Sequence, residues 1–84
     1  MARYTLLLLP EPDGSAITVE CPALPGLVTF GRTRDEALAM AREAVELYLE
    51  SVSARGLEVP VETVAPELAS IDVEMPAGLE AVPA

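Results

Sequence analysis

The chain has 84 residues, a formal net charge of −9, and neither histidine nor lysine. This length allows one domain, and a single cysteine, Cys21, excludes an intramolecular disulfide and a cysteine-only metal site. The acidic charge argues against direct nucleic-acid binding, which needs clustered positive charge, and suits solubility or a basic partner. Because no signal peptide or membrane-spanning run is visible, we expect a cytoplasmic protein with no membrane contact.

Three short strands are predicted in the first part of the chain. The apolar run at residues 3–9 has strand length, and Pro10 ends it. Pro12 and Gly14 then suit the corners of a turn. Apolar and polar residues alternate over residues 16–21, which predicts a second strand with one buried face, and residues 27–31 form the third.

A tight corner is predicted between the second strand and the helix that follows the third. Pro25 sets φ at one position of a turn, and Gly26 is free to adopt φ > 0 at the next. Gly31 lets the chain leave the third strand sharply. The alternative is an anion-binding glycine loop at a helix N-terminus, but Asp35 and Glu36 would repel phosphate there. We therefore predict a structural corner.

One amphipathic helix is predicted over residues 34–55. Thr33 and Glu36 match the S/T-x-x-E capping box, and Gly56 stands where a left-handed C-cap belongs. At helical spacing, one broad apolar face is formed by Ala37, Leu38, Ala41, Ala44, Val45, Tyr48, Leu49 and Val52.

Beyond the helix, residues 57–68 are interrupted by prolines and predict an extended connector. Ile71, Val73 and Met75 alternate with polar residues, which predicts a last strand that ends at Pro76, followed by a short tail over residues 77–84. The order β-β-β-α-β predicts a two-layer α+β domain over residues 1–76, with one helix packed on the sheet.

Three groups of residues resemble the HicB-like antitoxin family. They are a P-x-L-P-G segment (Pro22, Leu24, Pro25, Gly26), a G-x-T-x-x-E-A-L helix start (Gly31, Thr33, Glu36, Ala37, Leu38) and a G-x-x-x-P helix exit (Gly56, Pro60). The resemblance implies a partial ribonuclease H-like sheet and a protein that binds and neutralises HicA, a small basic toxin that cleaves RNA. Family members commonly carry a C-terminal DNA-binding domain, and nothing after Met75 is long enough for one, so we expect a short member. The alternative is a solitary oligomeric interaction domain with another partner and no toxin.

No catalytic residue, cofactor or metal site is predicted. Without histidine or lysine the usual nucleophile–base pairs cannot form. The first strand lacks the carboxylates that two-metal hydrolysis would need. Cys21 lies on the apolar side of its strand, where a buried, inert thiol is the expected state. The protein is therefore expected not to be an enzyme.

Two surfaces on the helix are candidates for binding. Glu43, Glu46 and Glu50 share one face and form an acidic ridge, which is either a solvated surface or a docking surface for a basic partner. Met40 and Leu47 lie beside the main apolar face and either widen the core or mark self-association.

The first strand is apolar on both of its sides, with Leu7 and Leu9 opposite Tyr4, Leu6 and Leu8. An antiparallel sheet normally carries polar residues on a side that meets water. We therefore expect a homo-oligomer, at least a dimer, in which a second copy covers Leu7 and Leu9. The alternative is that residues 57–68 fold back over this face.

Overall fold

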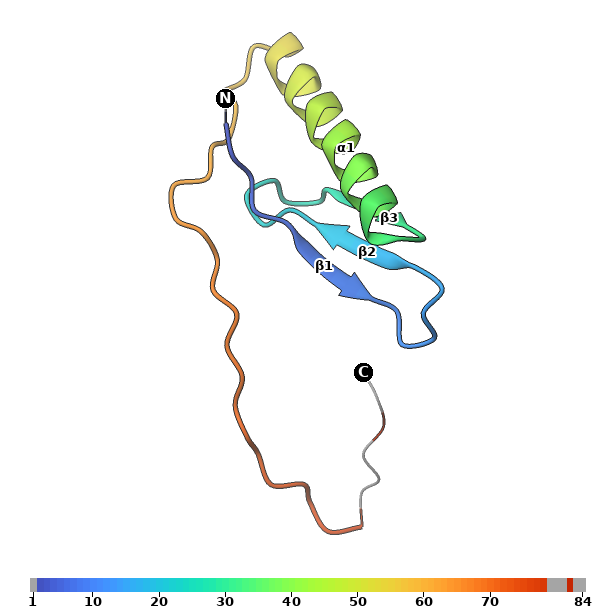
Figure 1. The fold of residues 1–84 in the computed structure, drawn as a ribbon. Coiled ribbons are helices and arrows are strands. Elements are labelled where there is room, and N and C mark those ends of the chain that lie inside the picture. The colour runs from blue at the N-terminus through green and yellow to red at the C-terminus, as the bar shows by residue number, and fades with distance from the viewer. Residues whose placement is uncertain (1, 79–81, 83–84) are drawn as a thin grey trace.

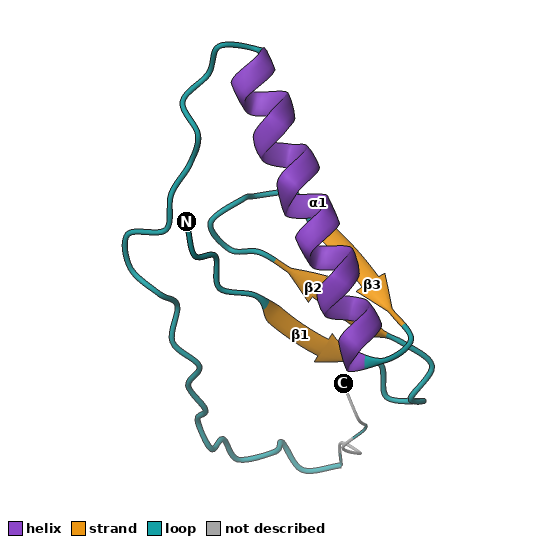
Figure 2. Cartoon of the chain, turned by 45° about the horizontal axis from the view of Figure 1, so that its top comes forward, coloured by secondary structure: helices purple, strands orange, loops and turns teal. Residues whose placement is uncertain are grey.

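The computed structural model describes residues 2–78 and 82. Strands β1 (Leu7–Pro10), β2 (Ile17–Glu20) and β3 (Val28–Gly31) form an antiparallel sheet in the order β1-β2-β3. Helix α1 (Arg34–Ala54) lies across one face of this sheet, as Figures 1 and 2 show. The predicted two-layer α+β class is confirmed, with a β-β-β-α arrangement among the described residues.

The core lies between the helix and the sheet and has two adjoining parts. Val19 packs with Ala37 and Ala41, and all three side chains are fully buried. The second part is built around Cys21, Leu24 and Leu27, next to the C-terminal half of α1. The small alanines let the helix approach the sheet closely. The predicted apolar face of the helix packs on the sheet, with Ala37, Ala41 and Val52 buried and its other residues half-buried.

The corner before β3 is a pair of successive turns. The Leu24 N–H donates to the Cys21 carbonyl (3.0 Å), and the Leu27 N–H donates to the Leu24 carbonyl (3.1 Å). Gly26 has φ of +87°, so with Pro25 before it the second turn has the type II pattern. The corner places Leu24 and Leu27 in the core, which confirms its structural role.

Gly31 is required for a different reason, which is lack of space. A Cβ atom there would lie 2.6 Å from the Cα of Ala37 and 2.8 Å from the carbonyl carbon of Glu36. The first turn of α1 therefore rests directly on the end of β3. The N-cap is formed as predicted, because the Glu36 N–H donates to the Thr33 hydroxyl oxygen at 3.1 Å.

The C-terminal end of α1 is closed by a Schellman motif. Gly56 has φ of +70°, its N–H donates to the Ser53 carbonyl (3.0 Å), and the Leu57 N–H donates to the Val52 carbonyl (3.1 Å). The left-handed cap predicted at Gly56 is confirmed.

The last predicted strand, at residues 70–76, is not formed. After the helix, residues 57–78 make an extended arm that leaves the rest of the domain (Figure 1) and contains no strand or helix. Ile71, Val73 and Met75 alternate as predicted, but 84%, 70% and 54% of their surfaces are exposed. The pattern is that of a strand, yet no neighbouring strand in the described chain accepts its hydrogen bonds. Residues 79–81, 83 and 84 of the predicted tail lie outside the described residues.

The arm also does not cover the sheet face opposite the helix. On that face Val28 and Phe30 are 60% and 61% exposed, and Leu9 is 45% exposed. Within the arm, Val61, Val64 and Leu68 are exposed as well. The folded-back alternative is therefore not what the single chain adopts.

Candidate protein-binding surfaces

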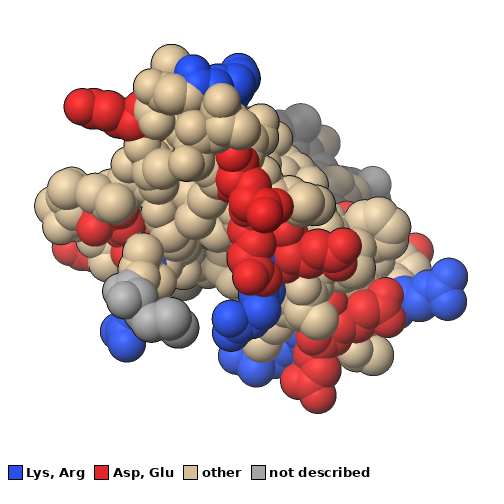
Figure 3. Space-filling model, turned by 90° about the horizontal axis from the view of Figure 1, so that it is seen from above, with Lys and Arg blue, Asp and Glu red and all other residues tan. Residues whose placement is uncertain are grey.

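The acidic ridge predicted on the helix is present on α1. Glu43, Glu46 and Glu50 are all exposed, and their spacing of three and four residues places them along one side of the helix. In the view from above, acidic side chains form a band with arginine side chains at its margin (Figure 3). The ridge is thus a solvent-facing, negatively charged surface that a basic protein could contact.

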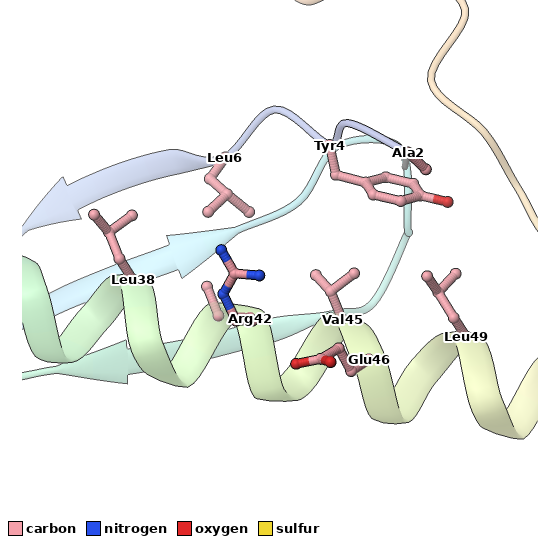
Figure 4. Close-up of a pocket in the computed structure, with 9 residues that line it drawn as sticks. Ala2, Tyr4, Leu6, Leu38, Arg42, Val45, Glu46 and Leu49 are labelled. Carbon is pink, nitrogen blue, oxygen red and sulfur yellow. The ribbon is translucent and has the colours of Figure 1, made fainter.

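An apolar groove runs between α1 and the segment that leads into β1, and we call it the edge groove (Figure 4). It has a volume of about 540 Å³. Apolar side chains from both elements point into it, and Arg42 and Glu46 add its charged groups. Its apolar lining consists of Ala2, Tyr4, Leu6, Leu38, Ala41, Val45 and Leu49.

Sequence reasoning assigned most of this lining to the core and missed the groove. Leu38, Val45 and Leu49 lie on the predicted buried face of α1, but they are only half-buried. Three strands are too narrow to cover the whole apolar face of the helix, so its side nearest the outer edge of β1 stays open. The sequence could have predicted the groove, because the apolar face of α1 is wider than three short strands can cover.

The edge groove continues into a second depression toward the end of the helix. Glu46 and Leu49 line both, and Glu50 and Val59 line the second. Two residues of the acidic ridge therefore stand at the rim of apolar surface. Protein interfaces commonly combine an apolar centre with a charged rim.

The residues predicted for self-association are exposed to different degrees and do not form one surface. Leu9 is exposed and Leu7 half-buried on the sheet face opposite α1, whereas Met40 and Leu47 are exposed on α1 itself. Val28 and Phe30 extend the sheet patch and were not predicted. Val28 and Phe30 alternate with Thr29 in β3. This alternation could have predicted that the two apolar side chains share the face opposite the helix.

The structure offers little for metal or nucleophilic chemistry in its described part. Cys21 is a free thiol and is buried. Within residues 2–78 and 82, no three His, Cys, Asp or Glu side chains gather where they could hold a metal ion. The pKa of Asp13 is lowered by hydrogen bonds with the side chain and then the backbone of Ser15, in an exposed turn. Over the same residues, no helix has both the length and the apolar character needed to cross a bilayer.

Comparison with known proteins identifies a family and several relatives with similar sequences. The family described as the HicB-like antitoxin of bacterial toxin-antitoxin systems matches residues 4–76. The UPF0150 protein Ta0767 of Thermoplasma acidophilum is 38% identical over 58 residues, which are 69% of this chain and 83% of that protein. The UPF0150 protein ssr1765 of Synechocystis is 43% identical over 60 residues, covering 71% of this chain and 75% of the relative.

A third relative, a UPF0150 protein of Archaeoglobus fulgidus, is 35% identical over 48 residues, which are 57% of this chain and 68% of that protein. No solved structure matches the chain at a significant level. The family match includes the double turn, the capped helix and most of the arm. The chain belongs to the HicB-like antitoxin family.

Proposed function

We propose that this protein binds and neutralises a small, basic, HicA-like toxin that cleaves RNA. Membership of the antitoxin family supports a toxin partner in general. The observation that carries the finer proposal is the acidic ridge of Glu43, Glu46 and Glu50, exposed along α1 and bordered by apolar surface. A basic partner would meet opposite charge and an apolar centre at one place.

We infer that the protein acts by binding and not by catalysis, in the cytoplasm and without a cofactor. The absence of histidine from the sequence supports this, because histidine is the side chain that most often serves as a general acid or base. The net charge of −9 supports a protein partner over a nucleic acid.

The test first looks for a neighbouring reading frame that encodes a small basic protein, and then combines that protein with the purified chain. RNA cleavage by the basic protein should stop at equimolar ratio, and titration calorimetry should show a complex. The triple variant Glu43→Gln, Glu46→Gln, Glu50→Gln should bind at least about 10-fold more weakly at physiological salt, since it removes three interfacial charges. The matched control, Glu11→Gln, Glu58→Gln, Glu67→Gln, changes the net charge equally at exposed positions outside the ridge and should lose less than about 3-fold. Equal losses in the two variants would refute the ridge as the docking surface.

A second candidate is a solitary homo-oligomeric interaction domain that has another partner. The exposed apolar side chains Leu9, Val28 and Phe30 on the sheet, with Met40 and Leu47 on the helix, favour self-association. The two candidates differ in gene context. A neighbouring reading frame for a short basic protein supports the antitoxin, and its absence, with a different protein captured on an affinity column, supports the solitary domain.

A further inference from the structure

The arm leaves the helix in a defined direction, beside the segment that precedes β1. The Tyr4 hydroxyl donates to the Pro60 carbonyl. The Thr5 N–H donates to one carboxylate oxygen of Glu62 (2.8 Å), and its hydroxyl donates to the other (2.7 Å). Residue numbers rise together along the two segments, so the arm begins parallel to the N-terminal segment, as Figures 1 and 2 also show.

This starting point determines what the arm can reach on its own domain. From Thr5 to Pro10, the end of β1, an extended chain covers about 17 Å. From Glu62 to Ile71 it covers about 30 Å, also taken from the extended rise per residue. A parallel course therefore carries Ile71, Val73 and Met75 past the end of the chain's own β1. Their exposure in the structure agrees with this.

The domain nevertheless has a place for an added strand. β1 pairs with β2 on one side, and no strand of the described chain pairs with its other side. The edge groove lies beside the segment that leads into this free edge, with Tyr4 and Leu6 facing Val45 and Leu49 across it (Figure 4). A strand added there would turn alternate side chains toward the groove and the others toward solvent.

The arm carries the alternation that this place requires. Ile71, Val73 and Met75 would point toward the groove, and Asp72 and Glu74 would point away from it, into water. Pairing would satisfy the free backbone groups of both the edge and the arm, and it would remove apolar surface from water on both sides.

We propose that residues 70–76 of one chain add a fourth strand to the free edge of β1 in a second copy, with Ile71, Val73 and Met75 in its edge groove. The exchange is reciprocal and gives a two-fold dimer in which each arm completes the other domain's sheet. This assembly is independent of any toxin. In this dimer, a second chain provides the strand that the sequence pattern predicts and that the single chain lacks.

Sedimentation of the full-length protein at low micromolar concentration tests the exchange. The wild type should be a dimer. The double variant Ile71→Asp, Val73→Asp should raise the dissociation constant by a factor on the order of 100 or more, because two apolar side chains per arm are lost from the groove. Its helical circular dichroism signal should not change, since α1 lies outside the substituted positions and both side chains are exposed in the single chain. The control, Val64→Asp, Leu68→Asp, adds the same charge to exposed positions of the same arm and should stay dimeric.

Cross-linking identifies which chain supplies the strand. When a Val73→Cys variant is mixed with a Leu38→Cys variant, mild oxidation should join the two different chains, and neither variant alone should form this product. A monomeric wild type would overturn the proposal, and so would a dimer that the Ile71→Asp, Val73→Asp variant leaves intact. A chain carrying both cysteines that closes only on itself would show that the arm folds back onto its own domain, which also overturns it.

Discussion

Gly31 offers the most direct test of how the sheet and helix fit together. In Gly31→Ala the added methyl would clash with the backbone N of Ala37 and lie 2.6 Å from its Cα, whereas ordinary contacts begin near 3.4 Å, so the start of α1 must move by at least about 0.8 Å. Ala37 is fully buried against Val19, and the displacement would loosen the centre of the core. Overpacking of this kind costs about 1–3 kcal/mol and sometimes more, and since the three clashing atoms (the N and Cα of Ala37 and the carbonyl carbon of Glu36) all belong to the backbone we expect about 3 kcal/mol.

Gly26→Ala is the matched control, because it adds the same methyl group under the opposite conditions. No atom lies within 4 Å of a Cβ at Gly26, but the residue has φ of +87°. The cost there is conformational, about 1–2 kcal/mol for a left-handed residue with a side chain. Gly26→Val should cost about 1–3 kcal/mol, because a β-branched residue is strained further in that region.

The assay is urea unfolding, followed by circular dichroism at one protein concentration, because assembly makes apparent stability concentration-dependent. In a parallel thermal scan 1 kcal/mol corresponds to about 4–8 °C in Tm for a domain of this size, so Gly31→Ala should melt roughly 12–24 °C below the wild type. If Gly31→Ala is no less stable than Gly26→Ala, the close contact between β3 and α1 is not part of the fold, and the reasoning fails.

Further predictions concern the cap, catalysis, nucleic acid and the sheet face. Thr33→Ala removes the acceptor of the Glu36 N–H and should cost about 1 kcal/mol, with Thr33→Ser, which keeps the oxygen, near wild type in the same unfolding assay. The purified protein should leave RNA and DNA intact in the presence of magnesium or manganese, and metal-dependent cleavage that persists through further purification would contradict this. It should not shift duplex DNA in gels at physiological salt and micromolar concentration, because a chain of charge −9 gains nothing from counterion release; a shift on its own promoter would overturn this expectation. Leu7→Thr with Leu9→Thr should weaken any assembly through the open sheet face without unfolding the chain, and an unchanged sedimentation profile at all concentrations would exclude that face as an interface.

Local sequence signals predicted most of the fold because their physical causes act over a few residues. The cap at Thr33, the positive φ at Gly26 and Gly56, and the buried stripe of α1 all depend on near neighbours in the chain. The strand predicted at residues 70–76 does not form in the single chain, because strand formation depends on a distant partner and not on near neighbours. Alternation specifies that a segment has two different sides, but pairing requires a neighbouring strand, and a periodic pattern contains no information about where that strand lies.

The edge groove was not predicted from the sequence for a related reason. Helical spacing identifies which residues of α1 share a face, and Val45 and Leu49 belong to it, but whether the sheet is wide enough to bury them depends on how many strands pair. The functional prediction at Glu43, Glu46 and Glu50 needed only the exposed side of the helix, so those positions could be placed from spacing alone.

The two proposed surfaces meet at Glu46, which lines the edge groove and belongs to the acidic ridge. An arm that occupies the groove with Ile71 and Val73 turned toward α1 leaves Asp72 and Glu74 on the opposite face of the sheet. A toxin that docks on the ridge at Glu46 would then lie next to the arm of the second chain along the rim of the groove. Because a ligand that contacts both chains binds the dimer better than the monomer, toxin binding and arm exchange would strengthen each other by the same factor.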